Sequence, residues 1–308
     1  MIAVVALAIV AIGAAAVLFR AERRSVNDRR AELAAATAGD VRAVLDAVDG
    51  ALVGASALVD EDGAIDRQRF ETFGEEALDA TGATAVALER RISADERDDI
   101  ENELGQPIED LDAGGSFVTA PIRPAYCPII DVVSRRPEPQ AVVSFDPCGD
   151  VTRAPVRQQA ADTRDVAVSP VVAGVPDGRA AIFVVRPLVT PGTSDVAGFI
   201  TAGYVVDDLV EATAAGLPAG AVLHITDDGT QVFGPVDVRG ASGVAEVDVL
   251  SRAWRVEVAG GIERDNGPAW LVLVGGLALA ALVAAVLVRR ARYEASIERL
   301  GATRGRQA

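Results

Sequence analysis

The chain has 308 residues, of which 50% are hydrophobic, and a formal net charge of −16. It contains no lysine, which excludes the phosphate-binding lysine of kinases and P-loop proteins. Its acidity argues against binding to nucleic acid, because like charges repel. A single histidine and two well-separated cysteines exclude a zinc site of the usual composition, and no G-x-S-x-G motif occurs. We therefore predict a protein that is not an enzyme and has neither a cofactor nor a metal site.

Two uncharged apolar segments lie near the ends of the chain, at 2–19 and 269–288. Each is long enough for a helix to cross a bilayer core of about 30 Å. We expect transmembrane helices at 1–19 and 267–288. The first segment could instead be a cleaved signal peptide, with the small residues 14–16 near the cleavage site. It lacks a basic n-region, and its apolar run exceeds the usual ~7–15 residues, which favours a retained anchor.

Arginine indicates the orientation. The tail, 289–308, carries six arginines and two glutamates, so its net charge is +4. Because the whole chain has a net charge of −16, residues 20–268 carry a net charge of −20. The positive-inside rule places this tail in the cytoplasm. We therefore expect a two-pass protein of the cytoplasmic membrane, with the acidic region outside the cytoplasm. Five arginines after the first segment oppose this orientation: Arg20, Arg23, Arg24, Arg29 and Arg30. Either the acidic domain is translocated regardless of them, or the first segment is removed.

Both cysteines, Cys127 and Cys148, lie in the external region. An even pair outside the cytoplasm is typical of a disulfide, which contributes about 3 kcal/mol through loop closure. The alternative is two buried thiols.

A helical stalk is predicted for residues 20–60, which contain no proline. Apolar residues recur there at spacings of three and four, as on one stripe of a helix: Val41, Val44, Leu45, Val48 and Leu52. Either the following domain covers this stripe, or an identical helix covers it in a dimer.

The region 61–215 mixes helical and strand patterns. Predicted helices are 66–78, a helix opened by the capping box Ser93/Glu96 and ending at 104, 151–161 with Asp150 as its cap, and 207–215. Predicted strands are 83–88, 125–133, 140–145, 166–172, 180–189 and 196–206.

A break at Gly216-Leu217-Pro218 separates a second unit, 216–266. It contains only strand patterns, at 221–226, 231–233, 244–250 and 253–259. Such a meander is too small to be independent, so we expect it to pack on the stalk helix. The fold class is therefore α+β, with two sheets in sequence.

A series of short motifs between residues 89 and 209 resembles the CHASE family, the extracytoplasmic sensor of bacterial and plant receptor kinases and cyclases. The motifs are Glu89-Arg90-Arg91-Ile92, Glu96-Arg97, Tyr126, Pro128, Ser144-Phe145-Asp146, Gln159-Ala160-Ala161-Asp162-Thr163, Ser169-Pro170, Phe183, Arg186-Pro187, Gly198 and Tyr204-Val205-Val206-Asp207-Asp208-Leu209. Three departures occur. The family usually has glycine where this chain has Ser144 and Arg164, and the segment between Pro128 and Asp146 is short. These departures bear on the ligand more than on the fold.

The resemblance implies a long stalk helix and tandem PAS-like domains. The distal one, 61–215, would bind the ligand, and the proximal one, 216–266, would be the small meander. In plant members an aspartate at the position of Asp146 contacts the ligand. Here Asp146 follows the predicted apolar strand 140–145, where a carboxylate could accept hydrogen bonds from a ligand. The alternative is that Asp146 only begins a turn.

Further ligand-binding candidates are aromatic or apolar: Tyr126, Ala167, Val168, Phe183, Val185 and Phe199. Ala167 and Val168 match a pocket-lining strand of the relatives, and a buried tyrosine needs a partner for its hydroxyl. The alternative for each apolar residue is plain core packing. We expect His224 to be a structural side chain in a strand.

We therefore interpret the chain as a membrane-anchored extracytoplasmic sensor of an unknown small molecule. We expect a homodimer through the stalk. The tail, 289–308, is too short for an output domain, so either a separate cytoplasmic signalling protein supplies the output or the chain is a truncated or degenerate receptor. The alternative is a membrane-tethered structural or assembly protein that uses a PAS-like domain for protein contacts. A cavity between Asp146, Ala167 and Phe183 would favour sensing, and a filled core there would favour the alternative.

Overall fold

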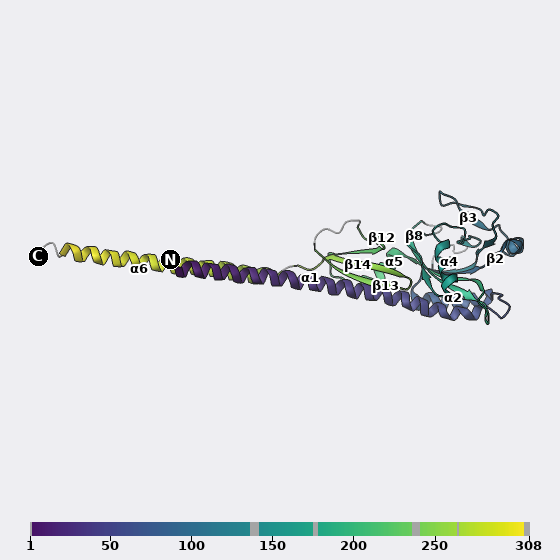
Figure 1. Ribbon diagram of the computed structural model, residues 1–308, viewed down its shortest axis with the longest axis horizontal. Coiled ribbons are helices and arrows are strands. Elements are labelled where there is room, and N and C mark those ends of the chain that lie inside the picture. Colours follow the sequence, from purple (N-terminus) through teal and green to yellow (C-terminus); the bar gives the residue numbers. More distant parts are fainter. Residues whose placement is uncertain (1, 136–141, 175–177, 236–240, 264, 305–308) are drawn as a thin grey trace. The chain divides into compact units, whose positions relative to one another are not determined.

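The computed structural model describes residues 2–135, 142–174, 178–235, 241–263 and 265–304 (Figure 1). The chain divides into two units, one formed by residues 1–30 and 262–308 and the other by residues 31–261. The first helix, α1 (Ile2–Val53), contributes to both units.

The first unit contains the apolar part of α1 and all of α6 (Gly267–Arg304). Both helices are long and apolar enough to cross a membrane, with mean hydropathies of 2.4 and 2.9. Small residues allow them to approach closely, because a Cβ added to Gly276 would overlap that of Ala11. The rings of Phe19 and Trp270 meet edge to face, with centroids 5.8 Å apart. Both apolar segments predicted from the sequence are therefore helical.

An antiparallel sheet of six strands forms the larger part of the second unit (Figure 1). Its order is β6-β1-β10-β9-β7, with β8 also paired to β9. The strands are β1 (Ala85–Arg90), β6 (Ile129–Ser134), β7 (Ala167–Val168), β8 (Val172–Ala173), β9 (Ala180–Val189) and β10 (Val196–Val205). Two short ribbons accompany it, β2 (Ile92–Ser93) with β5 (Ala125–Tyr126) and β3 (Glu109–Leu111) with β4 (Phe117–Thr119).

One face of the large sheet packs against the stalk. Val86, Leu88, Val184, Ile200 and Ala202 belong to one buried cluster with α1 and α2 (Arg67–Thr81). The α1 side of this cluster has spacings of three and four, the period of one helix face: Ala34, Ala38, Val41, Leu45, Val48 and Leu52. The domain itself therefore covers the apolar stripe of the stalk helix. The stalk ends in a short 3₁₀ turn, η1 (Gly54–Leu58).

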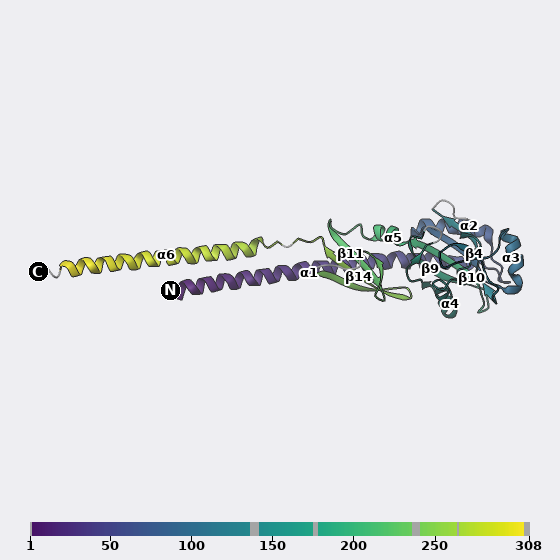
Figure 2. The same ribbon diagram turned by 90° about the horizontal axis from the view of Figure 1, so that it is seen from above.

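A second sheet also packs on α1. Its strands are β11 (Ala221–Asp227), β12 (Thr230–Phe233), β13 (Ser242–Val249) and β14 (Arg252–Gly260), in the order β12-β11-β14-β13. Figure 2 shows β11 and β14 beside α1, and Leu223, Trp254 and Val256 share the buried cluster of the stalk. The predicted meander is confirmed, and each strand lies within two residues of its predicted bounds.

Three predicted strands need correction. The stretch 125–133 is split into β5 and β6 around Pro128, and 166–172 is split into β7 and β8 around Ser169-Pro170. Proline has no N–H to donate to a ladder, which explains both breaks. The described part of 140–145 forms turns instead of a strand. Ser144 has φ 73°, which a strand cannot accommodate; residues 140 and 141 lie outside the described residues.

The remaining helices follow their caps. The side chain of Asp66 accepts from Arg69 N at 3.1 Å and opens α2. The predicted capping box is present and opens η2 (Ala94–Glu96), which continues into α3 (Arg97–Leu104). Helix α4 (Ala154–Thr163) begins later than predicted, because Asp150 caps the preceding turn. The last helix of this unit is α5 (Val206–Thr213).

Candidate ligand-binding site

The second face of the large sheet is unlike the face on α1. Strand register places Ala85 opposite Gly203 and Gly203 opposite Phe183, and Ala87 opposite Thr201. Because side chains alternate across a strand, these residues share one face with Glu89. The floor of this face is built from small side chains, which leaves space above it.

A cavity of about 90 Å³ lies over this floor. The sheet, α4 and the turn before α4 contribute its lining: Ala85, Ala87, Glu89, Ile129, Val132, Val142, Phe145, Pro147, Arg153, Arg157, Phe183, Thr201 and Gly203. Gly203 lets the ring of Phe183 pack closely on the sheet, because a Cβ there would lie 3.2 Å from this ring. Most of the lining is apolar, so its polar groups determine what can bind.

A buried ion pair forms one end of the cavity. Arg157 donates from Nε to Oε2 of Glu89 at 2.7 Å and from Nη2 to Oε1 at 2.5 Å. Thr201 Oγ1 also donates to Oε1 of Glu89, at 2.7 Å. The carboxylate is 0% exposed and the guanidinium 3% exposed, so neither charge has water to replace its partner. Removing one member would therefore leave an uncompensated buried charge.

A second guanidinium, that of Arg153, lies between two aromatic rings. Its Cζ is 5.6 Å from the ring centroids of both Phe145 and Phe183, within cation–π range. Nη1 donates to Oδ2 of Asp150 at 2.9 Å, and Nη2 donates to the carbonyl of Ala173. Burial lowers the pKa of Arg153, Asp150 opposes this effect, and the nearby charge of Arg157 adds to it. The position therefore disfavours further positive charge.

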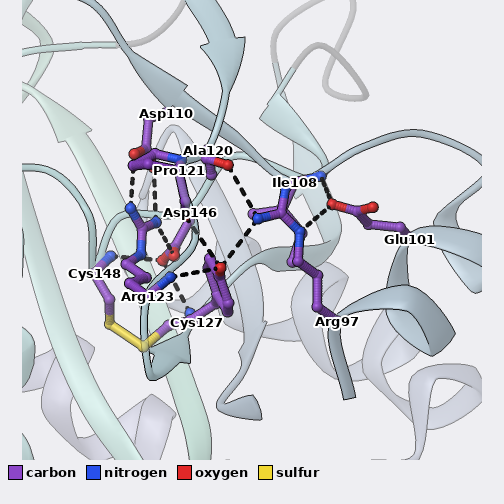
Figure 3. A network of polar contacts seen from close by, with 11 residues as sticks. Arg97, Glu101, Ile108, Asp110, Ala120, Pro121, Arg123, Cys127, Asp146 and Cys148 are labelled. Carbon is purple, nitrogen blue, oxygen red and sulfur yellow. Dashed lines mark hydrogen bonds and ion pairs between the residues drawn. A yellow bond between two sulfur atoms is a disulfide. The ribbon is translucent and has the colours of Figure 1, made fainter. Parts of the chain in front are cut away.

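Asp146 lies outside this cavity lining and is held by protein groups (Figure 3). Its Oδ1 accepts from the backbone N–H groups of Cys127 at 2.9 Å and Cys148 at 2.8 Å, and its Oδ2 pairs with Arg123. Arg123 also makes two bonds of 2.7 Å to Asp110. The role of Asp146 as a ligand contact stays a prediction, and this geometry favours the alternative of a structural turn residue.

Tyr126 belongs to the same polar network, and its hydroxyl is fully used. It accepts from Arg97 Nη1 and from Arg123 N, each at 3.0 Å, and lies 3.1 Å from the carbonyl oxygen of Pro121, to which it donates. The guanidinium groups of Arg97 and Arg123 lie 5.1 and 4.8 Å from its ring centroid. Its contact with ligand likewise stays a prediction.

The apolar candidates separate into three places. Phe183 lines the cavity. Ala167, Val185 and Phe199 fill a small buried cluster with α4 and the cysteines. Val168 belongs to the cluster on the α1 side. The structure thus brings only Phe183 of these five to the cavity lining.

Cys127 and Cys148 form a disulfide, with their Cα atoms 5.5 Å apart. Together with Asp146 they form the group of potential metal ligands found among the described residues. Both sulfurs are bonded to each other in the disulfide, so they cannot act as thiolate ligands. His224 lies half-buried in β11, and its Nδ1 has no hydrogen-bond partner within the described part of the chain.

The two family glycine positions share an unusual backbone conformation. Ser144 has φ 73° and Arg164, the C-cap of α4, has φ 55°. Both values lie in the left-handed region, where glycine has no steric penalty. The departures from glycine therefore keep the fold but place L side chains at strained positions. Ser144 is next to Phe145, which lines the cavity.

The sequence interpretation missed the polar residues of the cavity, namely Glu89, Arg153, Arg157 and Thr201. Two signals were available. Glu89 continues the alternation of Ala85 and Ala87 in an otherwise apolar strand, and the two arginines are four residues apart on a helix face. Neither signal identifies the partner, because Glu89 and Arg157 are 68 residues apart in sequence.

Two solved structures share this fold. A chain named methyl-accepting chemotaxis protein X matches with a TM-score of 0.51 and 14% identity, over 77% of this chain and 98% of that one. The periplasmic sensory domain of the Campylobacter jejuni chemoreceptor Tlp1 matches with a TM-score of 0.50 and 12% identity, over 78% and 96%. An extracellular ligand binding receptor from Desulfohalobium retbaense has a TM-score of 0.49 and 13% identity, and the match covers 75% of this chain but 40% of the receptor.

No functionally curated protein matches this chain. A family model described as the CHASE domain matches residues 63–235. The matched stretch is more than half of the 308 residues, and it includes the whole six-stranded sheet and every residue of the cavity lining. The chain therefore belongs to the CHASE-domain family.

Proposed function

We propose that this protein is a membrane-anchored sensor that binds a small molecule outside the cytoplasm, in the cavity between the large sheet and α4. One observation carries the proposal: a single cavity combines apolar walls with four buried polar residues, Glu89, Arg153, Arg157 and Thr201. Such a combination is typical of ligand sites, in which few polar groups fix the orientation of the ligand. No reaction is assigned to these groups.

The membrane location rests on the two apolar helices that flank the second unit. The arginine tail supports a cytoplasmic C-terminus and the cytoplasmic membrane as the location. Residues 20–268 then lie outside the cytoplasm, where a disulfide is stable.

The two sheets support a tandem arrangement of PAS-like domains. In this proposal, residues 61–215 form the distal ligand-binding domain around the large sheet, and residues 216–266 form the proximal domain. Both pack on α1, which offers a common element for passing a ligand-induced shift toward the membrane.

We also propose a homodimer through the stalk and a separate cytoplasmic signalling protein as the receiver. The buried stripe of α1 is occupied by the domain itself, so a dimer would use the exposed face of the stalk, which carries Gly39, Ala43 and Ala47. Cross-linking of cysteines placed at Ala43 in the full chain tests this contact, and an absence of cross-linked dimer would contradict it.

One observation favours the alternative of a membrane-tethered structural protein. The cavity measures about 90 Å³, below the roughly 300–1,000 Å³ of sites for drug-sized ligands. Beside it, Ala167, Val185 and Phe199 are packed as a filled core. A sensor with this cavity therefore suits a ligand much smaller than a drug-sized molecule.

The test is a thermal-shift screen of the purified full chain in detergent. The panel contains amino acids, short carboxylates, amides, amines and purines. A ligand present at 100 times its dissociation constant stabilises by about 2.7 kcal/mol, which raises Tm by about 5–10 °C for a domain of this size. Ala87→Leu fills the cavity and should remove the shift.

Ala80→Leu provides the matched control, because Ala80 is exposed on α2. It should keep the full shift. If no compound shifts the wild type, or if the shift survives in Ala87→Leu, the cavity is not a sensing site and the structural alternative gains support.

A further inference from the structure

The carboxylates around the cavity are largely occupied by protein donors. A carboxylate has about four acceptor positions. Asp150 accepts from Thr152 N, Thr152 Oγ1, Arg153 N and Arg153 Nη1, at 2.5 to 2.9 Å. Glu89 accepts two bonds from Arg157 and one from Thr201. Neither carboxylate therefore offers a ready site for the N–H groups of a ligand.

The donors, in contrast, are in surplus. A guanidinium has five N–H donors. Arg153 uses Nη1 on Asp150 and Nη2 on Ala173, and its Nε meets no acceptor among the described residues. Arg153 is only 5% exposed and lines the cavity, and its Nε is not one of the fully buried side-chain atoms that lack a partner. A donor that is accessible but meets no protein acceptor favours a bound molecule that supplies acceptors.

The charge at this position points to an anion rather than a neutral acceptor. Arg153 and Arg157 are both buried near the first turn of α4, and the positive end of a helix dipole adds to their field. Burial lowers the pKa of Arg153, Asp150 opposes this effect, and the neighbouring guanidinium of Arg157 adds to it. An oxyanion beside Arg153 would stabilise its charged form and accept from its remaining donors.

The rest of the lining determines the remainder of the ligand. Phe145 and Phe183 flank Arg153, and Ala87, Ile129 and Val132 complete an apolar wall. An aliphatic group of a few carbons fits this wall and the volume of about 90 Å³.

We propose that the cavity binds a short-chain aliphatic carboxylate, with its carboxylate on Arg153 and its tail between Phe145, Phe183 and the sheet. This assignment rests on the proposed sensing function of the cavity and specifies its ligand class. Arg153 is then the residue that selects anions.

Calorimetric titration of the full chain in detergent tests the assignment. Propionate, propionamide and propylammonium are compared at constant ionic strength set with sodium chloride, because the three differ mainly in the charged or neutral head. Propionate should bind at least tenfold more tightly than propionamide, and propylammonium should not bind. Arg153→Gln should weaken propionate binding roughly 10- to 150-fold, as expected for a lost charge-assisted hydrogen bond.

Three variants control for folding and position. Arg153→Lys keeps the positive charge and should retain part of the affinity, whereas Asp150→Asn removes the competing negative charge and should leave propionate binding equal or tighter. Arg164→Gln, at the exposed C-terminal end of α4, should bind propionate like the wild type. Melting without ligand shows whether each variant is folded; if Arg153→Gln is unfolded, the Asp150→Asn and Arg153→Lys results decide.

The outcomes separate the ligand class from the function. If propionamide or propylammonium binds as well as propionate, and Ala87→Leu abolishes that binding, the carboxylate assignment is wrong while the sensing role of the cavity stands. If propionate binds equally well to wild type and Arg153→Gln, the assignment of Arg153 is wrong. If no compound of the three or of the broader panel binds, the proposed function itself fails.

Discussion

The two faces of the large sheet are made by the same strands and serve opposite purposes. On the α1 side, Val86, Leu88 and Ile200 are 0% exposed and belong to the main buried cluster. On the α4 side, the intervening positions hold small, polar or aromatic residues around a cavity, among them Ala87 and Glu89. Strand alternation thus keeps the packed face and the cavity face apart, although adjacent residues are only one peptide bond away from each other.

The two faces should therefore differ in whether a substitution changes stability or ligand binding. A substitution on the α1 face should lower the free energy of unfolding and leave ligand affinity alone. A substitution on the α4 face should change affinity, and it should change stability only where a buried charge loses its partner.

The largest effect is expected for Glu89→Ala, the charged position on the α4 face. It leaves Arg157 buried without its carboxylate, which should lower the free energy of unfolding by about 3–5 kcal/mol. Urea unfolding of the full chain in detergent measures this loss. The double variant Glu89→Met/Arg157→Met should recover most of it, because no unpaired charge remains. A loss below about 1 kcal/mol for Glu89→Ala would mean that water reaches the pair.

The neighbouring residue gives the opposite result. Leu88→Ala removes a fully buried side chain from the α1 face and should cost about 3 kcal/mol through lost burial and a new cavity. The Tm increase caused by a bound ligand should stay unchanged. Thermal melts with and without the best compound of the panel measure both quantities. A variant that keeps its Tm but loses the ligand shift would reverse the assignment of the two faces.

Asp146 is a residue whose role, in stability or in binding, can be tested directly. It is buried beside the α4 face and is bonded only to protein groups. Asp146→Ala should lower the free energy of unfolding by about 2–3 kcal/mol, since Arg123 and two backbone N–H groups lose an acceptor. Arg123 keeps Asp110, so the loss should be smaller than for Glu89→Ala. An unchanged Tm together with lost ligand binding would instead establish Asp146 as a ligand contact.

Alkaline pH probes the α1 side through Tyr204. Burial raises the pKa of this phenol to about 12, and its hydroxyl donates to the backbone carbonyl of Thr81 at 3.0 Å. The neutral form is thus favoured by folding: its contribution is complete below pH 10 and is lost as pH rises toward 12. The loss should be roughly 1–2 kcal/mol. The chain has no lysine, so few other groups titrate there, and Tyr204→Phe should melt without this pH dependence.

The smallest effect is expected at the C-terminal end of α4. Arg164 has a left-handed backbone with φ 55°, which is strained for a residue with a Cβ. Arg164→Gly removes this strain and should raise the free energy of unfolding by about 0.5–1 kcal/mol. Arg164→Ala, which also lacks the guanidinium but keeps a Cβ, should give no gain. Equal stability of the two variants would show that the backbone is unstrained there. Ligand affinity should be the same in both.

Local patterns were sufficient for much of the fold. The stripe of α1, the caps Asp66 and Ser93, and the strands of the meander depend on residues close in sequence, and the structure has them nearly as predicted. The strand predicted for 140–145 failed, because the positive φ of Ser144 is set by its bonds to Ile129 and Glu109 rather than by its neighbours.

The candidate site is harder to predict from the sequence than the fold, because its geometry depends on contacts between residues that are far apart in the chain. Glu89 is recognisable as a charge in an apolar strand, but its partner Arg157 comes from a helix 68 residues later. The contacts of Asp146 require Cys127, Cys148 and Arg123 to come together in space. No periodic pattern in the sequence predicts this arrangement. The sequence alone therefore does not distinguish Asp146 as a ligand contact from Asp146 as a structural carboxylate.

The alternation along β1, β9 and β10 also has a consequence for how such a sensor can diverge. Positions such as 85, 87, 183, 201 and 203 line the cavity and do not face the stalk. Exchanges at these positions could adapt a duplicated copy of this chain to another molecule, while the intervening positions remain limited by the volume available against α1. A new specificity can therefore arise by single exchanges, without an intermediate that has lost its fold.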